Sequence, residues 1–288
     1  MSLSFRGSVN RWECDENDHL NVRFCEEKLW QTLTLGLLDA GIVQDEAAQN
    51  LTASLRCQHI RFQSESRVAD PLSGYFYAVS APWAGSERAF LAELVNERSG
   101  DVACTMIAEF EGLDGPWSAI ERDSKELAHA LPRGLSEELD LFDLNLNQAR
   151  ERGFQIIGKG LAEPAHCDIN GHLLPHLYMG YISDAVPHLW RLLDPEQHTS
   201  TVDGGVVVEF RRRYRGLLLG GHRYVIASGV AEYGPKLLRF VHCLFDVSTD
   251  RCVAVGQAMA LRMNLSTRRS IPLTEAQQAH LANVKLQL

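Results

Sequence analysis

Two short segments of this chain repeat the same residue types at the same spacing. ECDENDHLN occupies residues 13–21, and HCDINGHLL occupies residues 166–174. Asp15 recurs as Asp168 and His19 recurs as His172, in both cases 153 residues later (168 minus 15, 172 minus 19). A carboxylate and an imidazole at this spacing can activate water or attack a carbonyl carbon. The repeat therefore predicts a site for acid–base or nucleophilic chemistry that is encoded twice.

Each motif precedes a stretch with helical periodicity. Apolar residues recur at i, i+3 and i+4 from Phe24 to Ala40 after the first motif, and from Leu174 to Leu193 after the second. This spacing predicts a long helix with one broad buried face in each copy. Gly41 suits the position after the end of the first helix, and Pro187 should bend or shorten the second.

Around each helix the pattern changes to the alternation of β-strands. A first strand is predicted upstream of each motif, and four antiparallel strands downstream of each helix, an α+β order. The ranges are 4–12, 55–65, 74–83, 87–97 and 102–112 in the first copy, and 155–164, 205–215, 222–232, 236–247 and 252–264 in the second. Aligning residues 60–62 with 208–210 implies five extra residues in the first copy's helix–strand connection.

The order of elements gives four segments. Residues 1–112 form a first unit, 113–153 a connector, 154–265 a second unit, and 266–288 a tail. The tail carries a Thr-x-x-Gln capping box at Thr274 and Gln277, which predicts a helix there.

Composition excludes several classes of protein. The chain has 288 residues, of which 45% are hydrophobic and 23% charged, as in soluble globular proteins. Its start has no apolar signal segment and the chain no long uncharged apolar run, which argues against secretion and membrane insertion. Seven scattered cysteines indicate reduced thiols in a cytoplasm. The net charge of −9 argues against nucleic-acid binding.

The motif, the helix and the strand order together resemble the hotdog fold, in the branch of the 4-hydroxybenzoyl-CoA thioesterase-like and long-chain acyl-CoA thioesterases. Their junction looks like D-x-x-x-H-x-N with an aromatic residue six positions after the His. The first copy fits through Asp15, His19 and Asn21, but has Cys25 at the aromatic position. The second fits through Asp168, His172 and Tyr178, with Leu174 in place of the Asn.

The resemblance implies two tandem hotdog units, each a long central helix wrapped by a five-stranded antiparallel sheet, paired as a pseudo-dimer. It also implies hydrolysis of an acyl-CoA thioester at the interface, with no metal and no cofactor beyond the CoA of the substrate. Asp15 would be general base or nucleophile, with His19 and Asn21 orienting water or the thioester; Asp168 and His172 would act likewise. Family members commonly associate further, so a homo-oligomer is expected.

Two further groups are candidates for substrate binding. Arg211, Arg213 and Arg215 share one strand face and could hold the phosphates of CoA, with Arg67 as the matching residue of the first copy. An ion-paired sheet edge facing acidic residues of the connector is about as well supported. Tyr178 could line an acyl tunnel, although a core position suits its place on the apolar stripe better.

Other interpretations stay open at this point. An Asp before a helix is often only a cap for the helix N-terminus. A hotdog enoyl-CoA hydratase or dehydratase is a second enzyme class, although its D-x-N-P-x-H pattern has a different spacing and a proline. A non-catalytic acyl-CoA-binding module is the third interpretation.

Overall fold

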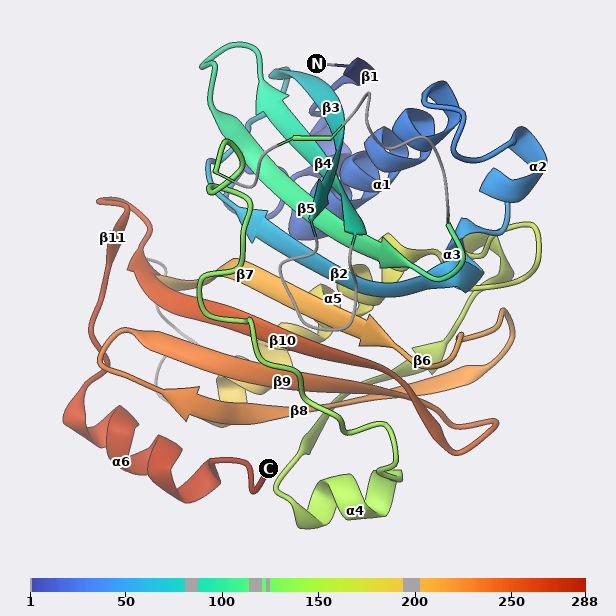
Figure 1. Cartoon of the computed structure of the whole chain (residues 1–288). Helices are drawn as coiled ribbons and strands as arrows, with labels where there is room; N and C mark the ends of the chain where they lie inside the picture. Colours follow the sequence, from blue (N-terminus) through green and yellow to red (C-terminus); the bar gives the residue numbers. More distant parts are fainter. Residues whose placement is uncertain (1, 81–87, 114–120, 123–124, 194–202) are drawn as a thin grey trace.

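The computed structural model describes residues 2–80, 88–113, 121–122, 125–193 and 203–288. Its strands form a single antiparallel sheet in the order β1-β3-β4-β5-β2-β7-β10-β9-β8-β6, with β11 paired to β10. The first five strands of this order come from the first half of the sequence and the rest from the second half (Figure 1). Each half contributes one long helix, and the two halves join where β2 pairs with β7.

The first half is built around one helix. A short 3₁₀ turn at Arg11–Glu13 leads to the first motif, and the elements in chain order are β1 (Ser2–Ser8), α1 (Val22–Asp39), α2 (Asp45–Ala48), α3 (Leu51–Ser54), β2 (Leu55–Phe62), β3 (Pro71–Ser80), β4 (Arg88–Asn96) and β5 (Val102–Phe110). Helix α1 ends where predicted, with Ala40 as its C-cap and Gly41 next at a φ of 67°, a conformation that glycine adopts without strain.

The second half repeats this plan after the connector helix α4 (Leu146–Glu151). A 3₁₀ turn at Pro164–His166 precedes the second motif, and the elements are β6 (Gln155–Leu161), α5 (Pro175–Leu193), β7 (Asp203–Tyr214), β8 (Arg223–Tyr233), β9 (Leu237–Asp246), β10 (Arg251–Asn264), β11 (Arg269–Ser270) and α6 (Glu275–Val284). Thr274 caps α6 through the predicted capping box with Gln277. Pro187 lies inside α5.

Strand register shows which residues of the two halves are equivalent. In the first half a bulge on β2 lies opposite Glu109 and Phe110 of β5, and in the second a bulge on β7 lies opposite Met259 and Ala260 of β10. Phe110 therefore corresponds to Ala260, and Leu55 of β2, which pairs with Phe110, corresponds to Val207 of β7. The strand offset is then 152 (207 minus 55), so the predicted five-residue difference in the helix–strand connection is wrong: it is a single residue.

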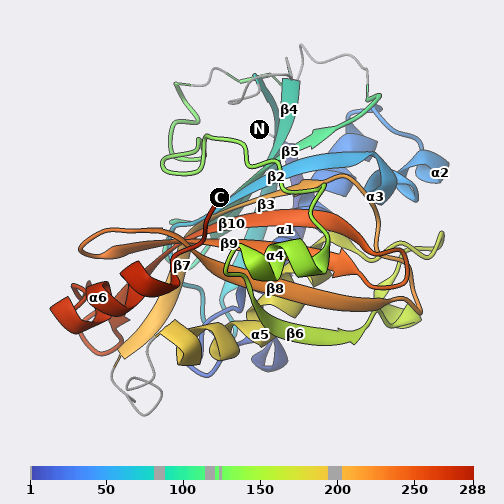
Figure 2. The same ribbon diagram turned by 90° about the horizontal axis from the view of Figure 1, so that it is seen from below.

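The two long helices lie on one face of the sheet and contact each other, while the connector crosses the opposite face (Figure 2). Apolar side chains of α1, α5 and the inner sheet face form the main core. Connector residues such as Phe142, Leu144 and Ala149 form a second core against the outer faces of β8, β9 and β10. Within the described residues, no helix is long and apolar enough to cross a bilayer.

Candidate active site

The first motif forms a tight loop between the 3₁₀ turn and α1. The backbone N–H of Asp15 donates to the His19 carbonyl at 2.8 Å, and the N–H of Asp18 donates to the Asp15 carbonyl at 3.1 Å. Asp18 occupies the left-handed region at a φ of 60°, and the equivalent residue of the second loop is Gly171, at 81°. The two motifs thus fold alike, and the second uses the residue best suited to this conformation.

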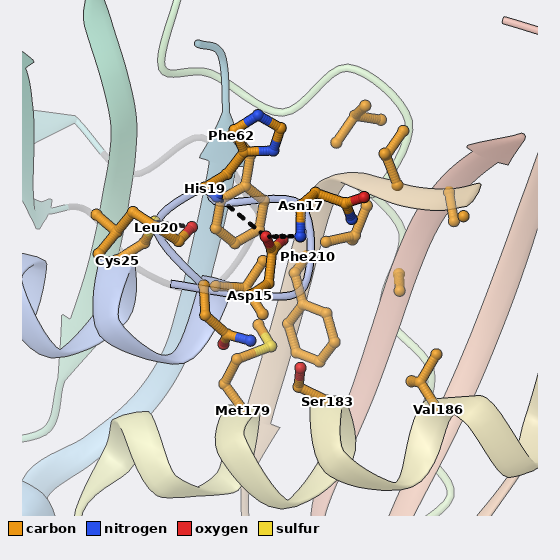
Figure 3. Close-up of a pocket in the computed structure, with 18 of the residues that line it drawn as sticks. Asp15, Asn17, His19, Leu20, Cys25, Phe62, Met179, Ser183, Val186 and Phe210 are labelled. Atoms are coloured by element: carbon orange, nitrogen blue, oxygen red, sulfur yellow. Dashed lines mark hydrogen bonds between the residues drawn. The ribbon is translucent and has the colours of Figure 1, made fainter. Parts of the chain in front are cut away.

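Asp15 is held by backbone amides of its own loop. Its Oδ1 accepts from the N–H of Asn17 at 2.8 Å and from the N–H of His19 at 3.1 Å (Figure 3). Asp15 does not cap α1, because Asn21 is the N-cap and its Oδ1 accepts from the Arg23 N–H at 2.9 Å. Asp15 therefore lies in the loop that precedes α1 and not at the helix N-terminus. Its Oδ2 has no hydrogen-bond partner among the described residues.

Asp15 lines a cavity of about 830 Å³ between the first loop, α5 and the inner face of β7, β9 and β10. This volume is within the range of about 300–1,000 Å³ that is common for ligand sites. Figure 3 shows Asp15 and Asn17 above Met179, Ser183 and Phe210. The partly exposed side chains of Glu65 and Arg268 form a polar mouth, and the interior is mainly apolar, with contributions from Ile182, Val186, Leu189, Trp190, Val207, Phe240 and Ala260.

The His19 imidazole points to two charged side chains at this mouth. Arg268 Nη2 lies 2.6 Å from His19 Nε2, and Glu65 Oε2 lies 3.1 Å from the same nitrogen. Burial lowers the pKa of His19; Glu65 opposes this effect and Arg268 adds to it. A neutral His19 accepts from Arg268 through Nε2, and Arg268 also pairs with Glu65 at 3.0 Å. The imidazole is thus fixed by charge rather than by Asp15.

Two amides complete the first junction. Asn21, the third motif residue, uses its Oδ1 for the helix cap, which leaves its NH₂ group available beside the cavity that it lines. Asn17 also lines the cavity, and its side-chain amide has no partner among the described residues. Either NH₂ group can donate to an oxygen that gains negative charge.

The second junction arranges the same residues differently. Asp168 Oδ1 accepts from the N–H groups of Asn170 and His172, both at 2.9 Å. Its Oδ2, however, lies 3.3 Å from His172 Nδ1, so both carboxylate oxygens are engaged. The Asn170 side chain donates to Asn50 Oδ1 at 2.7 Å and to the Gln49 carbonyl at 3.2 Å, in the segment between α2 and α3.

A buried polar cluster occupies the position next to the second junction. Arg212 donates to Glu26, to Gln58 Oε1 at 2.8 Å and to the Pro175 carbonyl at 3.0 Å, and Tyr214 donates to Gln58 Oε1 at 2.5 Å. Burial raises the pKa of Glu26 to about 7, and the guanidinium of Arg212 opposes the rise.

The equivalent residues of the first junction are apolar: Met179 for Glu26, Ile60 for Arg212, Phe210 for Gln58 and Phe62 for Tyr214, by the motif and strand offsets.

Aromatic rings occupy the position deeper under α1. Trp30 lies 6.1 Å from Phe110, and Phe110 lies 6.1 Å from Phe90, between ring centroids. The residues equivalent to Trp30 and Phe110 in the other half are Ser183 and Ala260, which line the cavity. Small residues under α5 thus leave the space that large rings occupy under α1.

The arginine cluster faces the connector, as the alternative interpretation expected. Arg211 is buried and donates to the Ser136 carbonyl at 2.7 Å, Arg213 pairs with Glu138 at 3.1 Å, and Arg215 pairs with Asp140 and Asp143 at 3.0 and 3.1 Å. None of the three lines the cavity. Arg67 is exposed beside the mouth, where its backbone bridges to His19.

Tyr178 is a core residue and does not line the cavity. Its ring packs edge-on against Tyr214 at 5.2 Å, and its hydroxyl accepts from the Leu218 N–H at 3.0 Å. Among the described residues, no group of three or more His, Cys, Asp or Glu side chains is arranged to hold a metal ion.

The polar residues of the cavity that sequence reasoning missed include Asn17, Glu65, Arg268 and His242. The recurrence of Asn17 as Asn170 was a signal that could have identified the first. No local pattern marks the other three. Arg268, for example, follows the second unit in the sequence and comes close to the first motif only through the fold.

The fold is that of known thioesterases. No protein-family model matches the chain, and a search of curated proteins found no match. Among solved structures, a 12:0-ACP thioesterase from Umbellularia californica is 14% identical, with a TM-score of 0.59 over 90% of this chain and 94% of that chain. An acyl-ACP thioesterase from Bacteroides thetaiotaomicron is 11% identical, with a TM-score of 0.57 over 89% and 96%.

A putative oleoyl thioesterase from Lactobacillus plantarum is similar as well, at 11% identity and a TM-score of 0.55 over 90% of this chain and 95% of that chain. Each of these structures matches nearly the whole length of the chain, so the likeness includes both halves and their pairing. The chain therefore has the tandem hotdog fold, with both units on one polypeptide.

Proposed function

We propose that this protein hydrolyses an acyl-CoA thioester to the free acid and CoA at the first junction. The observation that carries the proposal is the free Oδ2 of Asp15 at the polar mouth of an apolar cavity. An acyl chain fits the apolar interior, which places its thioester carbonyl at the mouth beside Asp15. Two of the similar solved structures are named as acyl-ACP thioesterases, so the same thioester on an acyl carrier protein is the second substrate to test.

The chemistry follows from the positions of the polar groups. The Asp15 carboxylate, oriented through Oδ1, takes a proton from water as it attacks the carbonyl carbon, or attacks that carbon itself to form a mixed anhydride that water then hydrolyses. The NH₂ groups of Asn17 and Asn21 donate to the oxygen that becomes negative. Collapse of the tetrahedral intermediate breaks the carbon–sulfur bond, and the thiolate leaves as CoA after protonation.

The polar residues of the second junction hold segments of the chain in place and do not act in catalysis. Its carboxylate is fully engaged, and the cluster of Glu26, Arg212, Gln58 and Tyr214 occupies the place where the first junction has its cavity. We therefore assign one active site to each chain.

The test is a matched pair of substitutions, Asp15→Asn and Asp168→Asn, assayed by thiol release from a panel of acyl-CoA and acyl carrier protein thioesters. Asp15→Asn should lower kcat by about 10³-fold, the usual contribution of a general base, while Asp168→Asn should stay within about threefold of the wild type. Thermal unfolding controls for folding. Equal losses in both variants would contradict the one-site assignment, and no thiol release from the wild type would refute the function.

A further inference from the structure

One polar side chain lies deep in the otherwise apolar part of the cavity. His242 of β9 lines the cavity, is only 2% exposed, and faces the same side of the sheet as Phe240 and Leu244. The Phe210 and Phe240 rings flank the imidazole at centroid distances of 6.1 and 6.3 Å. Gly256 makes this arrangement possible, because a Cβ there would lie 2.8 Å from the Phe210 ring.

Among the described residues, only the Nδ1 nitrogen of His242 has a hydrogen-bond partner. Ser228, directly opposite on β8 and wholly buried, lies with its Oγ 2.7 Å from His242 Nδ1. The Nε2 atom has no hydrogen-bond partner among the described residues. Burial lowers the pKa of His242 to about 4, so the ring is neutral near pH 7 and carries one N–H and one lone pair. The Nε2 atom is accessible at the cavity that His242 lines, so a ligand in the cavity can supply its hydrogen bond.

The fold does not require a polar pair at this place. In the first half, Ala92 is equivalent to His242, and Phe76, which lies opposite Ala92, is equivalent to Ser228. Both equivalences follow from the register relative to the bulge on the neighbouring strand. Both are apolar and buried, and the first half packs around them. The Ser228–His242 pair is therefore a feature of the half with the cavity, and not of the sheet.

We propose that His242 Nε2 binds a hydroxyl or oxo group on the acyl chain, which makes the preferred substrate a hydroxyacyl or oxoacyl thioester. This inference rests on the proposed function. Phe210 lies close to Asp15 in Figure 3, and its ring also stacks on the His242 imidazole, with 6.1 Å between the centroids. The polar group of the substrate is therefore several carbons away from the carbonyl, and Ser228 holds the ring in the orientation that receives it.

The experiment compares saturated acyl-CoA with hydroxyacyl-CoA and oxoacyl-CoA of equal chain length, substituted near the carbonyl, in the middle or at the end. Wild-type protein should prefer one mid-chain substituted substrate by about tenfold or more in kcat/KM, the worth of one hydrogen bond of about 1.4 kcal/mol. His242→Phe should abolish this preference while retaining hydrolysis of the saturated chain. Ser228→Ala should reduce it, and His242→Gln should keep part of it.

Phe240→Leu is the control, because it changes the same wall without altering its polarity and should leave the ratio between the substrate classes unchanged. Wild-type preference for the saturated chain, or a ratio that His242→Phe does not alter, overturns the inference. The free acids are titrated in parallel by calorimetry. If no thioester is hydrolysed, the proposed function fails, while the ratio of acid affinities still decides the role of His242. If His242→Phe does not fold, His242→Gln and Ser228→Ala carry the test.

Discussion

At the residue scale, the difference between the two junctions lies in what each carboxylate and imidazole contacts. Asp168 and His172 contact one another, whereas His19 turns to Arg268 and Glu65 and leaves one oxygen of Asp15 exposed to the cavity. The same motif thus gives a closed pair in one half and an open carboxylate in the other. Residues from elsewhere in the chain, not the motif itself, decide which arrangement forms.

This arrangement predicts how the pKa of His19 responds to its neighbours. Arg268→Gln should raise the pKa of His19, because it removes a positive charge that disfavours the imidazolium and leaves Glu65, which favours it. Glu65→Gln should lower the pKa further for the opposite reason. Arg67→Gln, a weaker contributor of the same sign as Arg268, should raise it less.

Titration of the His19 ring by NMR measures these shifts, with His19→Gln used to assign the signal. If activity requires neutral His19, the acid limb of kcat/KM should move to higher pH in Arg268→Gln and to lower pH in Glu65→Gln. If the pKa of His19 shifted in the same direction in both variants, the two charges would not act on His19 as the distances indicate.

At the element scale, the connector accounts for the arginines of β7. Arg213 and Arg215 are paired with Glu138, Asp140 and Asp143 across the outer face of the sheet, on the side away from the two long helices. Alanine at either position should therefore change KM for acyl-CoA by less than about twofold, since exposed ion pairs contribute little energy. A rise of about tenfold or more that depends on salt would instead restore these arginines to a role in binding CoA phosphates.

The buried cluster between α1 and β7 allows a second prediction at this scale. Glu26→Met alone should lower the free energy of unfolding by about 3–5 kcal/mol, because it leaves the Arg212 guanidinium buried without its carboxylate. The double variant Glu26→Met, Arg212→Ile introduces the residues of the first junction and should recover most of that loss, since Gln58 and Tyr214 still bond each other. Urea unfolding measures both. A double variant as unstable as the single would show that the ion pair itself is indispensable.

The elements themselves were largely predictable from the sequence. The repeated motif, the helical period and the alternation of apolar residues located both helices and the order of the strands, because these patterns are local consequences of burial on one face. The alignment of residues 60–62 with 208–210, an offset of 148, was wrong because it matched apolar residues on strands in which the bulge, and not hydrophobicity, defines the register. The predicted strand ends at residues 81–83 and 87 lie outside the described residues.

The candidate site was predictable only in part. Asp15 and His19 were found because their types recur, but the capping role of Asn21 depends on where the helix begins, and the partners Glu65 and Arg268 come from distant segments. His242 sits in a strand whose alternation reads as ordinary core. Whether such a residue faces a cavity depends on the volume of side chains on other elements, such as Ser183 and Ala260, and no local pattern records that.

At the scale of the whole molecule, one chain supplies two long helices, a continuous sheet and two junctions, yet the packing differs between the two junctions. The β2–β7 pairing places the halves in equivalent positions, so a cavity at one junction has a counterpart position at the other. Under α1 that position contains Trp30, Phe90 and Phe110, and beside the second junction it contains the Glu26–Arg212 pair. Pairing two units on one polypeptide lets each junction diverge separately, because a substitution in one half is not copied into the other.

This asymmetry predicts the stoichiometry of ligand binding. Titration with a non-hydrolysable thioether analogue of acyl-CoA should reach saturation at about one ligand per chain, because filling the second position would require displacement of buried aromatic rings and an ion pair, each a cost of several kcal/mol. Substitution of Phe240 by Trp, which narrows the cavity beside His242, should abolish or weaken that binding event, whereas Phe90→Trp at the equivalent position of the first half should leave the affinity unchanged if it folds. Isothermal calorimetry gives the stoichiometry, and thermal unfolding shows whether each variant retains its packing. Two equivalent binding events per chain would mean that the packing under α1 opens for ligand, and the assignment of a single site would then be wrong.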